Sequence, residues 1–467
     1  MSTRVAVRET HTSTRELRLR MPFKYGIATM TEVPHLLLRA VVEIDGRVAT
    51  GFAADNLPPK WFTKNPATTF AEEIAEMREV IATACAHAVE VREAMNVFEW
   101  WRAVSAAQEA TAAERSWPPL LAGFGVSLIE RAVIDAWCRA NGMPFAHALR
   151  ANTLGIQLGA IHEELAGEPR DFLPSAPLNE VIARHTVGLS DPLTDADIPD
   201  DERVNDGQPQ ALEDCIRAYG LTHFKIKLCG NIERDRERLY RLASLLESAS
   251  PGCRFTLDGN ENYHAVAPFR ELWDQFLADP IIARFLVGLI FVEQPLHRDI
   301  ALSESAGADL LAWTQRPPII IDESEGDLRA LERALASGYA GTSHKNCKGI
   351  FRGIANAALI EQRRRTSPRP LHLSGEDLTN LGPVALLQDL AVAATLGITH
   401  VERNGHHYFR GLSEFPAAVQ REILARHGDL YRTHHGYPVV RVEQGKVSTR
   451  SVVAAPFGCA LADVAIE

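Results

Sequence analysis

Residues 221–230 read LTHFKIKLCG, and this stretch decides how the rest of the chain is interpreted. Its apolar residues alternate with Lys225 and Lys227, which is the pattern of a β-strand with one apolar face. Both lysines then lie on the other face of the strand. An edge strand with a solvated lysine face is the simplest interpretation, because exposed lysines are common. The neighbouring sequence decides between this interpretation and a functional one.

Short apolar runs of the same kind recur down to residue 405, and each is followed by a helical stretch. The polar residues that mark them are Lys227, Asp258, Glu293, Asp322, Lys345, His372 and Glu402, which lie 23 to 35 residues apart. A βα unit takes about 30 residues. Together with the run VIARHTVGL at 181–189, these runs predict eight strands. We therefore expect an α/β fold in which residues 180–430 form a (β/α)8 barrel.

The segments outside the repeat have different hydrophobic patterns. Residues 35–53 are typical of a β-hairpin around the turn DGR, and residues 68–116 and 125–150 have helical patterns. Residues 1–150 are therefore expected to form an N-terminal α+β capping domain. The strand-like segment at 436–467 is expected to return to this domain and complete it.

Composition limits the class of protein. The chain has 467 residues, of which 46% are hydrophobic and 23% charged, and its net charge is −11. Without a basic stripe, nucleic acid is not expected as a partner. Seven scattered cysteines without a C-x-x-C pair predict neither a disulfide framework nor a zinc ribbon, and they favour the reducing cytoplasm. No apolar run is long enough for a membrane span or a signal sequence.

Three acids end successive apolar runs, namely Asp258, Glu293 and Asp322. A single acid at a strand end is more often a helix N-cap. Three acids on neighbouring barrel strands would converge at one rim and repel each other without a cation. Oxygen donors without clustered His or Cys suit Mg²⁺, with Mn²⁺ as the other candidate. Asn260 could steady the site, and Glu323 is an alternative to Asp322.

The lysines of this segment are expected at the same rim of the barrel as the three acids. An inward-facing lysine in a barrel is costly unless it is paired or neutral. Burial and a second ammonium group both lower a lysine pKa, so one of Lys225 and Lys227 could act as a base near neutral pH. Lys345 ends the sixth run, across the barrel. Lysines on opposite sides of a substrate could remove a proton from one face and supply one to the other.

These motifs together resemble those of the enolase superfamily, and more narrowly its muconate lactonizing enzyme-like subgroup in the mandelate racemase/muconate lactonizing enzyme family. The matching pieces are KIK, DGN, EQP, DES and HKNCKG, in that order over about residues 220–350. The resemblance implies a magnesium-dependent isomerase or lyase. Such an enzyme removes the proton next to the carboxylate of a small-molecule substrate, and the metal stabilises the enolate. Racemisation or epimerisation, cycloisomerisation and syn-elimination are all open.

The resemblance also implies residue roles. Lys227 would be the base, Lys225 would assist it, and Lys345 would be the opposite acid or base. Asp258, Glu293 and Asp322 would be the metal ligands. Family members take substrate specificity from two capping-domain loops, which correspond to residues 22–32 and 55–64 here. Tyr25 and Lys60 are the candidate contacts in them, and the family also implies a homo-oligomer.

Two alternatives remain open at this point. His372 and Glu376 lie in the seventh run, and a histidine there resembles mandelate racemase, which predicts a sugar-acid dehydratase. The partner Asp of that subgroup is replaced by Lys345, so His372 is more readily a core residue. His407 follows the eighth run and is a further candidate for substrate contact. The other alternative is an inactive barrel that only binds a ligand.

Overall fold

The computed structural model describes residues 4–92 and 94–464, and its N-terminal part is an antiparallel sheet covered by helices. The sheet has the strand order β1-β2-β3. Its strands are β1 (Val5–Tyr25), β2 (Ala28–Ile44) and β3 (Arg47–Asn56). The helices are α1 (Phe70–Glu90), α2 (Val97–Arg115), α3 (Pro119–Asn141) and α4 (Phe145–Arg150).

Helix α3 packs directly on strand β3, and glycine makes this close approach possible. A Cβ atom at Gly51 would lie 2.0 Å from the Ala132 carbonyl oxygen of α3. Most of α3 is buried, since it lies between the sheet on one side and the other helices and the barrel on the other. The helix ends at Gly142, whose left-handed φ of 57° suits glycine.

The second part is a parallel barrel. Its strands are β4 (Glu180–Val187), β5 (His223–Lys227), β6 (Arg254–Asp258), β7 (Leu289–Glu293), β8 (Ile319–Ile320), β9 (Gly341–His344), β10 (His372–Gly375) and β11 (His400–Arg403). They are hydrogen-bonded in the order β8-β7-β6-β5-β4-β11-β10-β9. A bridge between Ile321 and Thr342 joins β8 to β9 and closes the ring. The predicted (β/α)8 barrel is thus confirmed, with all eight strands in the expected runs.

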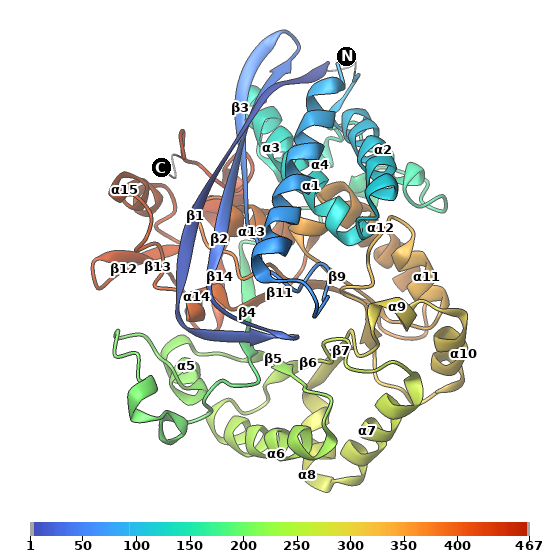
Figure 1. Ribbon diagram of the computed structural model, residues 1–467, viewed down its shortest axis with the longest axis vertical. Helices are drawn as coiled ribbons and strands as arrows, with labels where there is room; N and C mark the ends of the chain where they lie inside the picture. The colour runs from blue at the N-terminus through green and yellow to red at the C-terminus, as the bar shows by residue number, and fades with distance from the viewer. Residues whose placement is uncertain (1–3, 93, 465–467) are drawn as a thin grey trace.

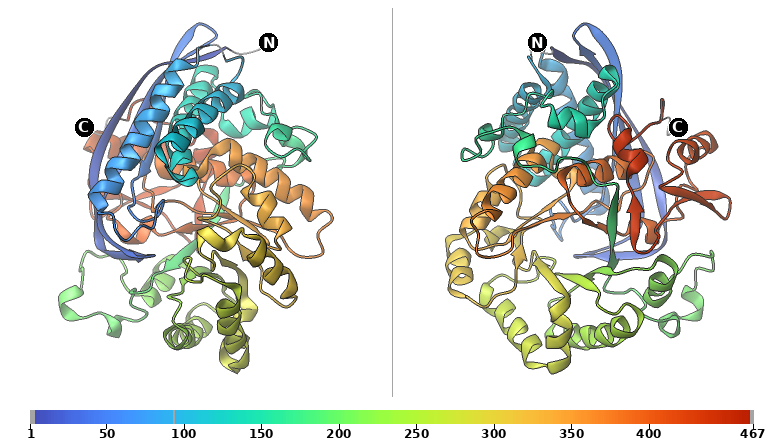
Figure 2. Two further views of the ribbon diagram at one scale, coloured as in Figure 1. Left: turned by 45° about the vertical axis from the view of Figure 1, so that its right-hand side comes forward. Right: turned by 180° about the vertical axis from the view of Figure 1, so that it is seen from behind.

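Helices follow the strands and surround the barrel (Figures 1 and 2). They are α5 (Leu212–Tyr219), α6 (Ile232–Ala249), α7 (Val266–Ala278), α8 (Pro280–Phe285), α9 (Arg298–Ala301), α10 (Glu304–Ala312), α11 (Ala330–Ala336), α12 (Ile350–Arg364) and α13 (Ala385–Leu396). After β11 come α14 (Gly405–Tyr408) and α15 (Ala417–Arg426). No helix within the described ranges combines the length and apolarity that a membrane span requires.

The C-terminal segment contacts both parts of the molecule. Strands β12 (Tyr431–His434) and β13 (Tyr437–Val440) pair with each other, whereas β14 (Lys446–Ser448) pairs antiparallel with barrel strand β4. Helix α16 (Arg450–Ala454) packs on α13. The residues after it reach the capping helices: the Phe145 N–H of α4 donates to the Pro456 carbonyl at 2.7 Å. The ends of the expected ranges, residues 1–3 and 465–467, lie outside the described residues.

The β1–β2 hairpin reaches from the far end of the capping part down to the barrel (blue in Figure 1). Its tip spans Tyr25 to Ala28, so residues 22–32, expected as a loop, are mostly strand. The tip lies at the carboxyl ends of the barrel strands, where it shares a cavity with Lys225 and Lys227. The capping part therefore covers the end of the barrel at which such folds place their sites.

Candidate active site

A cavity lies between the capping part and the carboxyl ends of the barrel strands. Its barrel side includes Lys225, Lys227, Asp258, Asp322, Lys345 and Glu402. Its capping side includes Phe23, Tyr25, Met30, Pro58, Trp61 and Lys64. The floor is charged and the roof is largely apolar, an arrangement that can hold a small molecule with an ionised group at one end.

Lys225 lies at the centre of the charged floor. Its side chain is buried, and its Nζ lies within 3.0 Å of four carboxylates: Asp258, Glu293, Glu376 and Glu402. The alternation along β5 produces this contact, because Lys225 and Lys227 point into the barrel while Phe224 and Ile226 pack outward. The solvated edge-strand interpretation of this segment is therefore wrong.

Lys227 is the last residue of β5 and donates from Nζ to Asp258 Oδ2 at 2.6 Å. Asp258 and Glu293 are the last residues of their strands as well. The strand register pairs Lys227 with Asp258, and Asp258 with Glu293. The three polar side chains thus form one layer at the rim of the barrel.

Lys345 approaches the cavity from the opposite side. It follows β9, which lies four strands from β5 in either direction around the closed ring. Its Nζ donates to Asp322 Oδ2 at 2.5 Å and lies 2.9 Å from Glu376. The Trp61 ring of the capping part covers this ammonium group at 5.0 Å. Lys227 and Lys345 therefore face the same cavity from opposite walls.

The carboxylates change the protonation that we expected for the lysines. Burial lowers the pKa of Lys225, but the surrounding acids outweigh it and hold this pKa well above its usual range. The pKa of Lys227 is also raised, because Asp258 outweighs burial and the repulsion from Lys225. The expectation that burial and mutual repulsion make one lysine neutral is thus wrong for this arrangement of charges, in which neighbouring acids are the stronger influence.

Glu293 is an acid of the floor with one carboxylate oxygen left unpaired. It is fully buried, and its Oε2 has no hydrogen-bond partner among the described residues. Burial and the adjacent Glu376 raise its pKa well above the usual range. By contrast, Lys225 and Lys345 outweigh burial at Asp258 and Asp322 respectively, so both of these pKa values are lowered.

The donor set fits a hard divalent cation. Oxygens of Glu293, Asp322 and Glu376 lie within 4.8 Å of one another, and all three residues are buried. Asp258 lies in the same layer, turned toward Lys227. Carboxylate oxygens are the ligands that Mg²⁺ prefers, and the set includes neither imidazole nor thiolate. The unpaired Glu293 oxygen gives such an ion a further ligand.

Two predicted supporting residues lie beside these acids. The Asn260 backbone N–H donates to Asp258 Oδ1 at 2.9 Å, and its side-chain amide donates to the same oxygen. Glu323 lines the cavity, and burial together with Asp322 raises its pKa to about 8. Asn260 thus orients a floor acid, while Glu323 has an oxygen without a partner among the described residues.

The capping residues differ in what they offer a ligand. Tyr25 lines the cavity, and its hydroxyl donates to the Pro59 carbonyl at 2.7 Å. Lys60 also lines the cavity, but its Nζ is paired with Glu73 at 2.8 Å. Lys60 is therefore neutralised within the capping part, whereas the neighbouring Trp61 lies over Lys345.

Comparison with known proteins rests on structure alone, since no protein-family model and no curated protein matches the sequence. A 2-chloromuconate cycloisomerase from Rhodococcus opacus matches with a TM-score of 0.59 at 16% identity, covering 95% of this chain and 94% of that one. An enolase from Bradyrhizobium, complexed with magnesium and mandelic acid, matches with a TM-score of 0.58 at 15% identity, covering 96% and 94%.

An N-succinyl Arg/Lys racemase from Bacillus cereus is similar to the same degree. Its TM-score is 0.57 at 15% identity, and the match covers 96% of this chain and 97% of that one. The protein has the fold of the mandelate racemase/muconate lactonizing enzyme family. The resemblance in the short motifs is thereby confirmed for the fold of almost the whole chain.

Within this fold, His372 lies away from the cavity. It is the first residue of β10 and pairs with Gly341, the first residue of β9. It therefore lies at the amino end of the barrel, beside the Phe291 ring at 5.4 Å. The expectation that it ends its strand is wrong because the strand continues to Gly375, and Glu376 is the residue that reaches the floor. From this position His372 does not reach the cavity, so it cannot serve there as the base of a dehydratase.

His407 also lies away from the cavity. It is buried in α14, where it contacts His185 and Cys215. The segment that contains it is a short buried helix that packs against β1 of the capping part. His407 therefore does not reach a ligand in the cavity.

Sequence reasoning missed three buried groups around the floor. Arg184 of β4 donates to Glu376 at 2.8 Å, and Lys348 lies 2.8 Å from Asp322. Gln294 accepts the Asp322 N–H at 2.6 Å. A charged residue inside an otherwise apolar run was the available signal for Arg184. Lys348 and Gln294 stand in turns after their strands, where exposure is the ordinary expectation.

Proposed function

We propose that this protein is an enzyme that removes the proton next to the carboxylate of a small-molecule substrate. The main observation in its support is that Lys227 and Lys345 lie on opposite walls of one cavity, above a buried floor of acids. A proton can then leave one face of a bound carbon and return to the other face. Racemisation or epimerisation uses both lysines, whereas cycloisomerisation or elimination needs only one of them as a proton carrier.

Asp258, Glu293 and Asp322 would hold the divalent cation, with Glu376 close enough to support it. Mg²⁺ is our proposal, since the Bradyrhizobium enolase and a dipeptide epimerase from Enterococcus faecalis, both of this fold, are complexed with magnesium. Mn²⁺ prefers the same oxygen ligands. The ion, when bound, would supply positive charge to the oxygens of the substrate carboxylate.

Lys227 acts as the base in this proposal. It must first lose its proton, and the negative charge of Asp258 opposes that loss. A cation that shares the negative charge of Asp258 would lower the pKa of Lys227 and so ease the loss of its proton. Neutral Lys227 then takes the proton from the substrate carbon and leaves an enolate. Lys345, held as an ammonium group under Trp61, returns a proton to the opposite face.

Lys225 assists by charge. Its ammonium group contacts four acids of the floor, so it holds these side chains together and faces the same cavity. The apolar roof of Phe23, Met30 and Trp61 supports a substrate with an apolar group beyond its carboxylate. The related folds bind mandelic acid and dipeptides, which are small carboxylates of this general kind.

Solvent deuterium incorporation tests the proposal. The protein is incubated with Mg²⁺ in D₂O and pools of acyl amino acids, dipeptides, sugar acids and lactones, and mass shifts are measured. We expect one acid to gain one deuterium in a reaction that Lys227→Ala abolishes. Lys446→Ala is the control, because this lysine is exposed and pairs with Glu180 outside the site. Exchange that persists in Lys227→Ala would contradict the assignment.

A further inference from the structure

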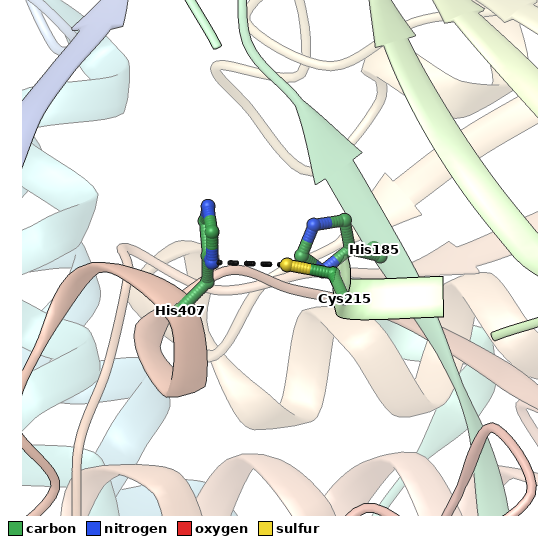
Figure 3. A group of neighbouring side chains, drawn as sticks. All are labelled: His185, Cys215 and His407. Atoms are coloured by element: carbon green, nitrogen blue, oxygen red, sulfur yellow. Dashed lines mark hydrogen bonds between the residues drawn. The ribbon is translucent and has the colours of Figure 1, made fainter. Parts of the chain in front are cut away.

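A second cluster of metal-ligating side chains lies outside the barrel. His185 of β4, Cys215 of α5 and His407 of α14 converge there, and all three are at most 2% exposed (Figure 3). His185 points outward from the barrel because its neighbours Arg184 and Thr186 point inward, toward Glu376 and Glu402. The cluster is thus separated from the acidic floor by the wall of the barrel.

The donor atoms lie close together, and the separation between the sulfur and one nitrogen matches a metal site. Cys215 Sγ lies 3.5 Å from His407 Nδ1, and one donor atom from each of the three residues lies within 4.8 Å of the others. Tetrahedral zinc has bonds of about 2.3 Å to sulfur and about 2.0–2.1 Å to nitrogen, which places neighbouring S and N donors about 3.5 Å apart. The observed S to N separation equals this edge length.

The chemistry of the donors selects the metal. Imidazole and thiolate suit Zn²⁺, whereas Mg²⁺ prefers oxygen. Both histidines are buried, and each offers a ring nitrogen to the same cluster.

A third histidine supports the arrangement. His406 Nε2 lies 3.3 Å from His185 Nδ1, so it can orient the His185 ring through this nitrogen. The other ring nitrogen of His406, Nδ1, is buried and has no hydrogen-bond partner among the described residues. Metal-ligating histidines are commonly fixed in this way by a polar neighbour.

We propose that His185, Cys215 and His407 bind one zinc ion, in a structural site separate from the acidic floor. When the zinc–sulfur bond forms, the Cys215 proton leaves to solvent, and no oxidation takes place. The fourth position of the ion is left for water or a rotated His406. The same residues without metal form a cluster in which the Cys215 thiol and His407 Nδ1 share a hydrogen bond, and the experiment separates the two states.

The site joins segments that border the active-site cavity. His407 is three residues from Asn404, which lines this cavity, and the His407 carbonyl accepts a hydrogen bond from Arg20 of β1 at 3.0 Å. Arg20 in turn pairs with Asp206, which lies in the segment that leads to Cys215. Zinc would therefore fasten the chain after β11 to β4 and to α5, and so hold one wall of the cavity.

Cobalt binding tests the site without any assay of turnover. Full-length protein with excess Mg²⁺ is titrated with Co²⁺, and the near-ultraviolet band from thiolate to cobalt is measured. Cobalt on the acidic floor produces no such band, because that site offers only oxygen. We expect the band to saturate at one cobalt per chain, to vanish on addition of zinc, and to be absent from Cys215→Ala. Cys138→Ala, which removes another fully buried thiol, should keep it.

Two further measurements distinguish loss of the metal site from misfolding of the variant. Thermal unfolding of the metal-free variants establishes that each is folded, and zinc should raise the midpoint for wild type and Cys138→Ala but not for Cys215→Ala. His407→Gln retains the thiol and should bind cobalt at least tenfold more weakly than wild type. A wild-type protein without the thiolate band, or a band that Cys215→Ala retains, would overturn the proposal and leave the function proposed for the barrel untouched.

Discussion

Lys225 is the residue on which the balance of buried charge in the barrel depends. Its ammonium group contacts four acids, and its side chain is only 2% exposed. Lys225→Met keeps the approximate length of the side chain but leaves Glu293, Glu376 and Glu402 with one cation fewer. Removal of one partner from a buried ion pair costs about 3–5 kcal/mol. We expect a loss of this size in the free energy of unfolding, measured with urea in buffer containing a chelator.

The control for this measurement is Lys446→Met. Lys446 pairs with Glu180 at the surface, where both side chains are about half exposed. Surface pairs contribute about 0–1 kcal/mol. Equal losses in the two variants would mean that the buried acids around Lys225 are protonated and need no cation.

The same residues show what can be predicted from sequence at this scale. The alternation FKIK fixes which face of β5 carries the lysines, because the side-chain period of a strand is two residues. The end of a strand is less well defined: RPLHLSG does not reveal that His372 begins β10 and that Glu376 follows its end. Arg184 could not be assigned to the floor, because its partners Ser374 and Glu376 are about 190 residues away in the chain.

At the scale of elements, Glu130 joins the capping helix α3 to the barrel helix α12. Its carboxylate accepts the Ile350 and Phe351 N–H groups at 3.1 and 2.8 Å, at the first turn of α12. Burial nevertheless raises its pKa from 4.5 to about 7. The folded state therefore binds a proton more tightly than the unfolded state, and stability from this group is lost as the pH rises from about 4.5 to 7.

Glu130→Gln tests this joint. The variant keeps an oxygen acceptor for α12 and cannot ionise. We expect the difference in unfolding free energy, wild type minus variant, to fall by about 3 kcal/mol between pH 4.5 and 7 and then to level off, since one pKa unit corresponds to about 1.4 kcal/mol. Urea unfolding at a series of pH values measures it. A difference that rises with pH would mean that the two N–H groups, and not burial, control this carboxylate.

The helices and strands themselves were the most predictable part of the chain. A regular spacing of about 30 residues predicts βα units, since each unit needs one strand, one helix and two turns. The C-terminal segment was less predictable. Strand β14 joins the barrel at β4, whereas residues after α16 contact the capping helices. Both locations bury apolar side chains, so hydrophobic pattern alone does not choose between them.

At the scale of the whole molecule, the two proposed ions act through different parts of the fold and can be separated by their effect on stability. An ion that binds only the folded state stabilises it by about 2.7 kcal/mol at 100 times its dissociation constant. We expect Mg²⁺ to raise the midpoint of thermal unfolding in wild type and in Cys215→Ala, but not in Glu293→Gln, which loses a charged ligand on the acidic floor.

Zinc should produce the converse pattern at the His185, Cys215 and His407 cluster, raising the midpoint in Glu293→Gln and not in Cys215→Ala. Calorimetric scans of the three proteins with each metal measure both effects. The comparison is informative because Glu293 and Cys215 lie on opposite sides of the barrel wall, so each variant leaves the other donor set intact. If Mg²⁺ stabilises Glu293→Gln as much as wild type, the acidic floor does not bind the cation through Glu293, and lysine charge alone must balance the floor.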